Sequence, residues 1–74
     1  MDFGVVLFHT TSSAMRAEKV LSKEGYSVKL IPTPRQFSSD CGIALRFGWQ
    51  KLKQIEALLE KNRVEIDLMR RFQE

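Results

Sequence analysis

The sequence contains very few residues of the kinds that build covalent or metal-bound scaffolds. It has a single cysteine, Cys41, a single histidine, His9, and two prolines in 74 residues. One cysteine cannot form a disulfide within the chain, which excludes a disulfide-stapled scaffold. One cysteine and one histidine cannot supply the four ligands of a structural zinc site. We therefore expect neither a metal nor another cofactor.

Long hydrophobic runs are missing as well. The longest uninterrupted aliphatic or aromatic run is residues 5–8, far short of the roughly 20 residues that cross a membrane. Residues 1–3 show neither the basic region nor the cleavage site of a signal peptide. Because an unpaired thiol is also unusual in exported proteins, we expect a cytoplasmic protein with no membrane partner.

The charge balance is mild, with 12 Lys and Arg against 9 Asp and Glu and a net charge of +3. Such a balance permits an anionic or acidic partner but does not demand nucleic acid, and we do not expect nucleic acid as a partner. The hydrophobic content of 43% excludes a disordered chain. The length predicts a single domain, residues 1–74, of marginal stability, because small domains bury a small share of their surface.

Hydrophobic periodicity predicts four strands and two helices. The strands are expected at residues 3–8, 26–31, 43–47 and 64–68, and the helices at residues 14–24 and 49–62. Gly25 is the residue type expected where the last turn of the first helix becomes left-handed. The tail that follows residue 68, with Arg70 and Arg71, is expected to be exposed and frayed.

The order βαββαβ predicts an α+β fold, a ferredoxin-like two-layer sandwich in which both helices cover one face of an antiparallel sheet. Right-handed crossovers place the strands in the order last, first, third, second. The first strand is apolar on both faces, so the uncovered face is expected to expose apolar surface. Such a surface favours self-association, and we expect a homodimer that forms through this open face.

The same topology predicts that one edge of the sheet gathers residues that are distant in the sequence. These are Cys41 with His9, Thr11, Ser12, Ser13, Arg35 and Gly42. The N-terminus of the first helix and the charge of Arg35 are expected to lower the pKa of the Cys41 thiol below about 8.5, whereas Asp40 would raise it. Gly42 is expected to allow close approach and a backbone conformation that is barred to other residues.

Each of these residues also has a simpler interpretation. A lone cysteine is most often a small buried hydrophobe, and the hydroxyls are most simply a helix cap. His9 would then cap or pack at a strand end, and Arg35 would be a solvated loop charge. The alternative function is a non-catalytic module for small-ligand binding or dimerisation, in which Cys41 only packs. RNA-binding domains share this fold order, but the basic and aromatic motif of those domains is missing here.

Several stretches resemble the putative selenium/sulfur carrier protein-like family of small prokaryotic proteins. They are residues 8–14, 17–21, 28–35 and 38–47. The most specific part is Pro34-Arg35 followed by Cys41-Gly42. The resemblance implies a carrier that holds sulfur or selenium on Cys41 as a persulfide or selenopersulfide.

A carrier of this kind implies two protein partners, a donor such as a cysteine desulfurase and an acceptor. It is therefore expected to be a carrier rather than a complete enzyme. The better-known sulfurtransferase carriers place Cys-Pro at the start of a helix, whereas here Cys41-Gly42 leads into a strand. Their mechanism therefore does not transfer directly to this chain.

Overall fold

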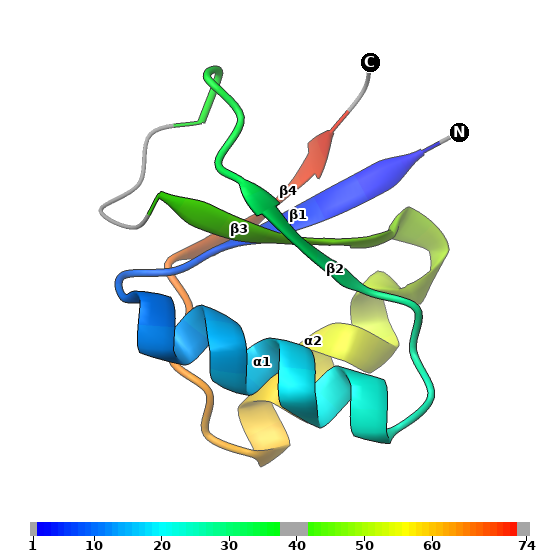
Figure 1. The fold of residues 1–74 in the computed structure, drawn as a ribbon. Helices are drawn as coiled ribbons and strands as arrows, with labels where there is room; N and C mark the ends of the chain where they lie inside the picture. Colours follow the sequence, from blue (N-terminus) through cyan, green and yellow to red (C-terminus); the bar gives the residue numbers. More distant parts are fainter. Residues whose placement is uncertain (1, 38–41, 73–74) are drawn as a thin grey trace.

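The structure, a computed structural model, describes residues 2–37 and 42–72. The elements are β1 (Phe3–Leu7), α1 (Thr11–Lys23), β2 (Lys29–Pro32), β3 (Ile43–Gly48), the 3-10 turn η1 (Trp49–Lys51), α2 (Leu52–Lys61) and β4 (Leu68–Phe72). Figure 1 shows both helices on one face of the sheet. The predicted α+β class with two layers is therefore confirmed.

The four strands form one sheet in the order β2-β3-β1-β4. All neighbouring strands are antiparallel. This is the strand order that the topology rules predicted, with β1 in the interior of the sheet. Within β1, Val6 pairs with Leu45 of β3 on one side and with Met69 of β4 on the other.

Helix α1 begins and ends with the local chemistry expected of its sequence. The side chain of Thr10 caps the first turn, and Gly25 follows the last turn with φ 90°. A positive φ is the conformation that glycine adopts most easily, so the prediction for Gly25 is confirmed. The buried stripe of α1 consists of alanines and a leucine, Ala14, Ala17 and Leu21, which lets the helix approach the sheet closely.

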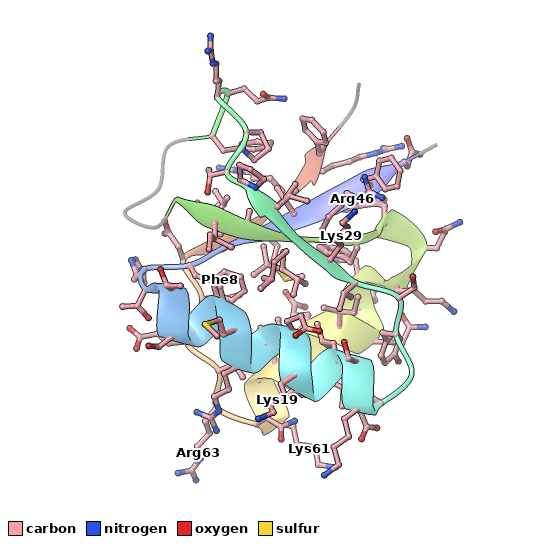
Figure 2. All side chains as sticks on the ribbon, in the orientation of Figure 1. Phe8, Lys19, Lys29, Arg46, Lys61 and Arg63 are labelled. Carbon is pink, nitrogen blue, oxygen red and sulfur yellow. The ribbon has the colours of Figure 1, made fainter. Side chains whose placement is uncertain are left out.

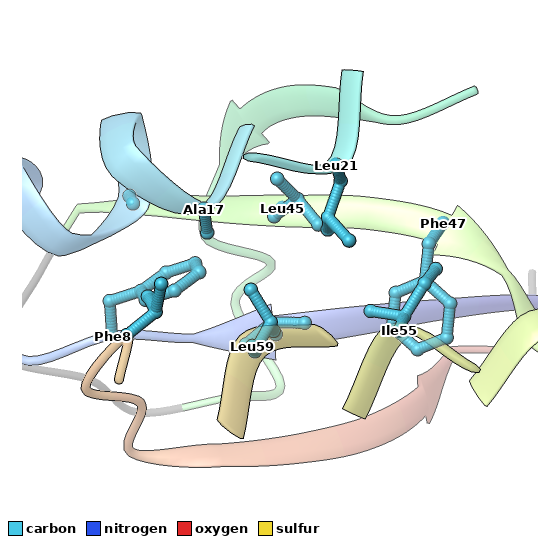
Figure 3. Packing of buried hydrophobic residues seen from close by; sticks show 10 residues of the cluster. Phe8, Ala17, Leu21, Leu45, Phe47, Ile55 and Leu59 are labelled. Carbon is cyan, nitrogen blue, oxygen red and sulfur yellow. The ribbon is translucent and has the colours of Figure 1, made fainter. Parts of the chain in front are cut away.

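The main core lies between the sheet and the helices. Its largest members are Phe8 and Phe47, which are 0% and 1% exposed. Figure 3 shows Leu21 of α1 and Ile55 and Leu59 of α2 directed toward Leu45 and Phe47 of the sheet. At roughly 25 cal/mol per Å² of apolar surface, burial of these side chains supplies most of the stabilisation.

The position of the last strand differs from the prediction. The expected strand at residues 64–68 is wrong, because β4 spans Leu68–Phe72. The amide of Val64 instead donates to the carbonyl of Leu59 at 2.9 Å, directly after α2. Val64 and Ile66 pack against the main core from a loop, which explains the alternating pattern. The tail expected to fray is therefore the edge strand itself, although Arg70 and Arg71 are exposed.

The open face of the sheet, the face turned away from the helices, also differs from expectation. Val5, Leu7 and Ala44 on this face are 0%, 1% and 0% exposed. They are covered by four partly buried side chains, Ile31, Phe37, Leu68 and Phe72. Phe37 comes from the loop after β2, so local chain buries the surface that was expected to be exposed. The burial of this surface removes the reason for expecting a homodimer, which stays an untested prediction.

In residues 2–37 and 42–72, no helix is long and apolar enough to cross a membrane.

Candidate functional site

Three chain segments meet at the end of the sheet where β1 finishes. Leu7 pairs with Ala44, and Pro32 pairs with Ile43. The amide of Thr33 donates to the carbonyl of Gly42 at 2.9 Å, which extends the β2–β3 ladder by one step. His9, Thr33 and Gly42 therefore lie at the same end of the sheet, although they are up to 33 positions apart in the sequence.

The hydroxyl cluster is organised around Thr10, which was not among the predicted site residues. Its Oγ1 accepts a hydrogen bond from the backbone N–H of Ser13 at 3.1 Å. The same oxygen donates to Ser13 Oγ at 3.1 Å. Thr11 and Ser12 are exposed in the first turn, which carries no acidic residue. The helix-cap interpretation of the cluster is therefore the one the geometry supports.

His9 lies beside a carboxylate that the sequence analysis missed. Its Nε2 is 3.9 Å from Oδ1 of Asp67, and the two side chains are 44% and 28% exposed. The amide of Asp67 donates to the carbonyl of Leu7 at 2.7 Å, which brings the segment before β4 against the end of β1. Correct placement of β4 would have revealed this neighbour, because Asp67 directly precedes that strand.

Arg35 belongs to a turn closed by the amide of Phe37, which donates to the carbonyl of Pro34 at 3.0 Å. Figure 1 shows residues 33–37 rising on the side of the sheet opposite the helices. Thr11, Ser12 and Ser13 begin α1 on the helix side. The structure thus places the segment that holds Arg35 and the first turn of α1 on different sides of the sheet.

Gly42 does not need the conformational freedom predicted for it. Its φ lies outside the left-handed region, and a Cβ added there would meet no atom of the described residues within 4 Å. The expectation of a barred conformation at Gly42 is therefore wrong, whereas that of a close backbone approach stays an untested prediction. Cys41, the residue at the centre of the predicted site, and its neighbour Asp40 lie outside the described residues.

A shallow depression of about 270 Å³ adjoins Gly42 at the free edge of the sheet. It is lined by Leu30, Ile31, Pro32, Gly42 and Ile43. Its walls are mainly apolar, so it suits an apolar side chain of a partner better than a charged ligand. Within residues 2–37 and 42–72, no three His, Cys, Asp or Glu side chains are grouped closely enough to hold a metal ion.

Together, the elements define a small α+β domain with one four-stranded antiparallel sheet and two helices on one face. Residues 3–69 match the family described as putative Se/S carrier protein-like. The chain belongs to this family. The resemblance noted at Pro34-Arg35 and Cys41-Gly42 is thereby confirmed at the level of the family.

The chain is also similar to an uncharacterized protein of Methanocaldococcus jannaschii. The two are 31% identical over 62 residues, which is 84% of this chain and 31% of the archaeal protein. The chain thus spans under a third of the length of this curated relative. No solved structure matches the chain significantly.

Proposed function

We propose that this protein carries a sulfur or selenium atom on the thiol of Cys41 and passes it from a donor protein to an acceptor protein. The observation that carries the proposal is the family match over residues 3–69, which spans the single cysteine of the chain. A carrier of a single chalcogen atom needs a nucleophile that can form a covalent bond to it. The thiolate of cysteine is such a nucleophile, and Cys41 is the chain's one thiol.

Loading by exchange requires no external oxidant. The Cys41 thiolate attacks the outer sulfur of a cysteine persulfide on the donor, such as a cysteine desulfurase. A bond forms between Cys41 Sγ and that sulfur, the sulfur–sulfur bond of the donor breaks, and the donor cysteine leaves as a thiolate. The outer sulfur keeps its oxidation state throughout. Transfer to the acceptor is the same exchange with Cys41 as the leaving group, and selenium in place of the outer sulfur follows the same balance.

The described neighbours are consistent with a site at this end of the sheet. The first turn of α1 lacks acidic residues, and the N-terminal end of a helix carries a partial positive charge that favours an anion nearby. The apolar depression beside Gly42 provides a small surface on which a donor or acceptor can dock. Neither partner needs a deep pocket, because a sulfur atom held on a side chain is delivered by direct contact.

Mass spectrometry tests the proposal directly. We expect the protein, incubated with a cysteine desulfurase and cysteine, to gain the mass of one sulfur atom on the peptide that contains Cys41. A reductant should remove the added mass, and Cys41→Ser should abolish the gain while thermal unfolding stays unchanged. Equal loading of the Cys41→Ser variant, or no loading of the parent protein by any persulfide donor, would overturn the proposal.

Alkylation kinetics test the state of the thiol. We expect the pKa of Cys41 to lie below its usual value, because a carrier must present a thiolate at neutral pH. Iodoacetamide should then react with the protein at pH 7 faster than with free cysteine. A rate equal to that of free cysteine would show that the protein does not activate the thiol.

A further inference from the structure

Three basic residues form one row across the open face of the sheet. Arg46 of β3 pairs with Lys29 of β2 on one side and with Val5 of β1 on the other. Val5 in turn pairs with Arg70 of β4. Directly opposed residues of antiparallel strands project to the same face, and Val5 belongs to the cluster on the open face. Figure 2 shows Lys29 and Arg46 together on this side, with Phe8 directed toward the helices.

The row has no acidic counterpart on the sheet. None of the four strands contains Asp or Glu. Residues 33–37, which rise over the same face, add Arg35 and no carboxylate. Four described acidic residues lie on the helices or at their ends, Glu18, Glu24, Glu56 and Glu60, and three flank the strands, Asp2, Glu65 and Asp67. Of these three, Asp2 pairs with Arg71, and Asp67 lies beside His9. A face with clustered cations and no Asp or Glu within its strands attracts a polyanion.

Aromatic rings adjoin the cations on the same face. Phe3 of β1 pairs with Phe72 of β4, and both side chains are partly exposed. The guanidinium of Arg46 lies over the ring of Phe3, 4.3 Å from its centroid. Phe37 meets Phe72 edge to face, with ring centroids 6.1 Å apart. Partly exposed rings beside a guanidinium plane offer surfaces on which nucleic-acid bases can stack.

We propose that the open face binds single-stranded nucleic acid. The phosphates would contact the row of Lys29, Arg46 and Arg70, and bases would stack against Phe3 and Phe72. An acidic protein surface would explain the cations alone, whereas the adjoining aromatic rings favour a ligand with flat bases. The inference does not depend on the carrier proposal, because it uses no residue of the cysteine segment.

The mild net charge and the missing basic and aromatic motif argued against nucleic acid. Arg70 and Phe72 were assigned to a frayed tail, and β4 now places both on the open face next to β1. The net charge of +3 also conceals the uneven distribution of charge, because the strands contain basic residues but no acidic ones.

Fluorescence anisotropy with labelled oligouridine and oligothymidine, each of about 12 nucleotides, tests the proposal. Three phosphate contacts predict a slope of about −2 for the logarithm of the affinity against the logarithm of the salt concentration. The affinity should then fall about 20-fold between about 50 and about 200 mM salt. Tighter binding of oligouridine would assign RNA as the ligand. Equal binding of the two oligonucleotides would mean that the protein recognises phosphates and bases alone.

Matched variants locate the binding surface. Arg70→Gln should weaken binding and reduce the magnitude of the salt slope by about 0.7. Phe72→Leu should weaken binding by about fivefold or more at an unchanged slope, because it removes a stacking ring but keeps an apolar side chain. Lys19→Gln, which removes an exposed charge from α1 on the other side of the molecule, should have no effect. Urea unfolding of each variant establishes that the fold is kept.

Three results would overturn the inference. The first is no binding of either oligonucleotide at about 50 mM salt. The second is an equal loss of affinity in Lys19→Gln and Arg70→Gln, which would show that binding does not depend on the open face. The third is unchanged binding in Phe72→Leu together with full competition by polyglutamate, which would identify an acidic protein as the ligand.

Discussion

Gly4 of β1 packs directly against the ring of Phe47. A Cβ at position 4 would lie 2.8 Å from Cε1 of Phe47 and 2.7 Å from Cε3 of Trp49. Carbon atoms in a packed core are separated by about 3.5–4.0 Å, so there is no room for even one methyl group. The two rings stack on each other with centroids 6.1 Å apart, which limits their freedom to move aside. Packing, rather than backbone conformation, therefore requires glycine here.

We accordingly expect Gly4→Ala to lower the free energy of unfolding by about 1–3 kcal/mol through overpacking. Gly42→Ala is the matched control, because a Cβ at position 42 would meet no atom within 4 Å in the part of the chain that the structure describes. Urea unfolding should show a destabilised Gly4→Ala variant and an unchanged Gly42→Ala variant. Equal stability of Gly4→Ala and the parent protein would mean that the two rings rearrange freely.

The cap formed by Thr10 leads to a second prediction. Thr10→Ala removes the acceptor of the Ser13 amide and should lower the free energy of unfolding by about 1 kcal/mol. Thr10→Ser should retain most of that energy, since serine is an equally good cap. Ser12→Ala, in the same exposed turn, serves as the control and should leave the thermal midpoint unchanged. A larger effect at Ser12 than at Thr10 would contradict the assignment of the cap.

The edge-to-face contact of Phe37 and Phe72 connects the loop after β2 to the last strand. A double-mutant cycle with Phe37→Ala and Phe72→Ala should give a coupling energy of about 0.5–1.5 kcal/mol, the range measured for aromatic pairs. The free energies come from urea unfolding of the four proteins. Strictly additive effects would show that the loop does not cover the open face in solution.

The corrected position of β4 predicts how the chain responds to truncation. A chain that ends at Leu68 lacks most of β4. It also lacks Met69, which packs against the main core, and Phe72, which covers the open face. Its free energy of unfolding should therefore fall by several kcal/mol. For a domain of this size such a loss is enough to unfold it. A chain that ends at Phe72 keeps the whole strand and should unfold like the parent protein. Cooperative unfolding of the shorter chain at the parent's midpoint would restore the prediction of a strand at residues 64–68.

Local sequence chemistry predicted much of the fold. The apolar run in β1 and the helical spacing in α1 and α2 identified the elements, and Gly25 marked the end of α1. Topology rules then gave the strand order, because few arrangements of this chain satisfy them. The prediction failed at β4, since the alternation at residues 64–68 joins side chains that belong to two different clusters. Val64 and Ile66 belong to the main core, and Leu68 and Phe72 belong to the open face.

For the candidate site, the residue types could be named but their neighbours could not. The single thiol at Cys41, the cap at the start of α1 and the charge of Arg35 can all be read from the chain. The contact of His9 with Asp67 and the placement of the segment holding Arg35 away from α1 arise only from tertiary structure. The same is true of the basic row, whose members Lys29, Arg46 and Arg70 become neighbours only through strand pairing. Periodicity reports which side of its own strand a residue occupies, whereas neighbours across strands depend on a register set by the burial of the whole sheet.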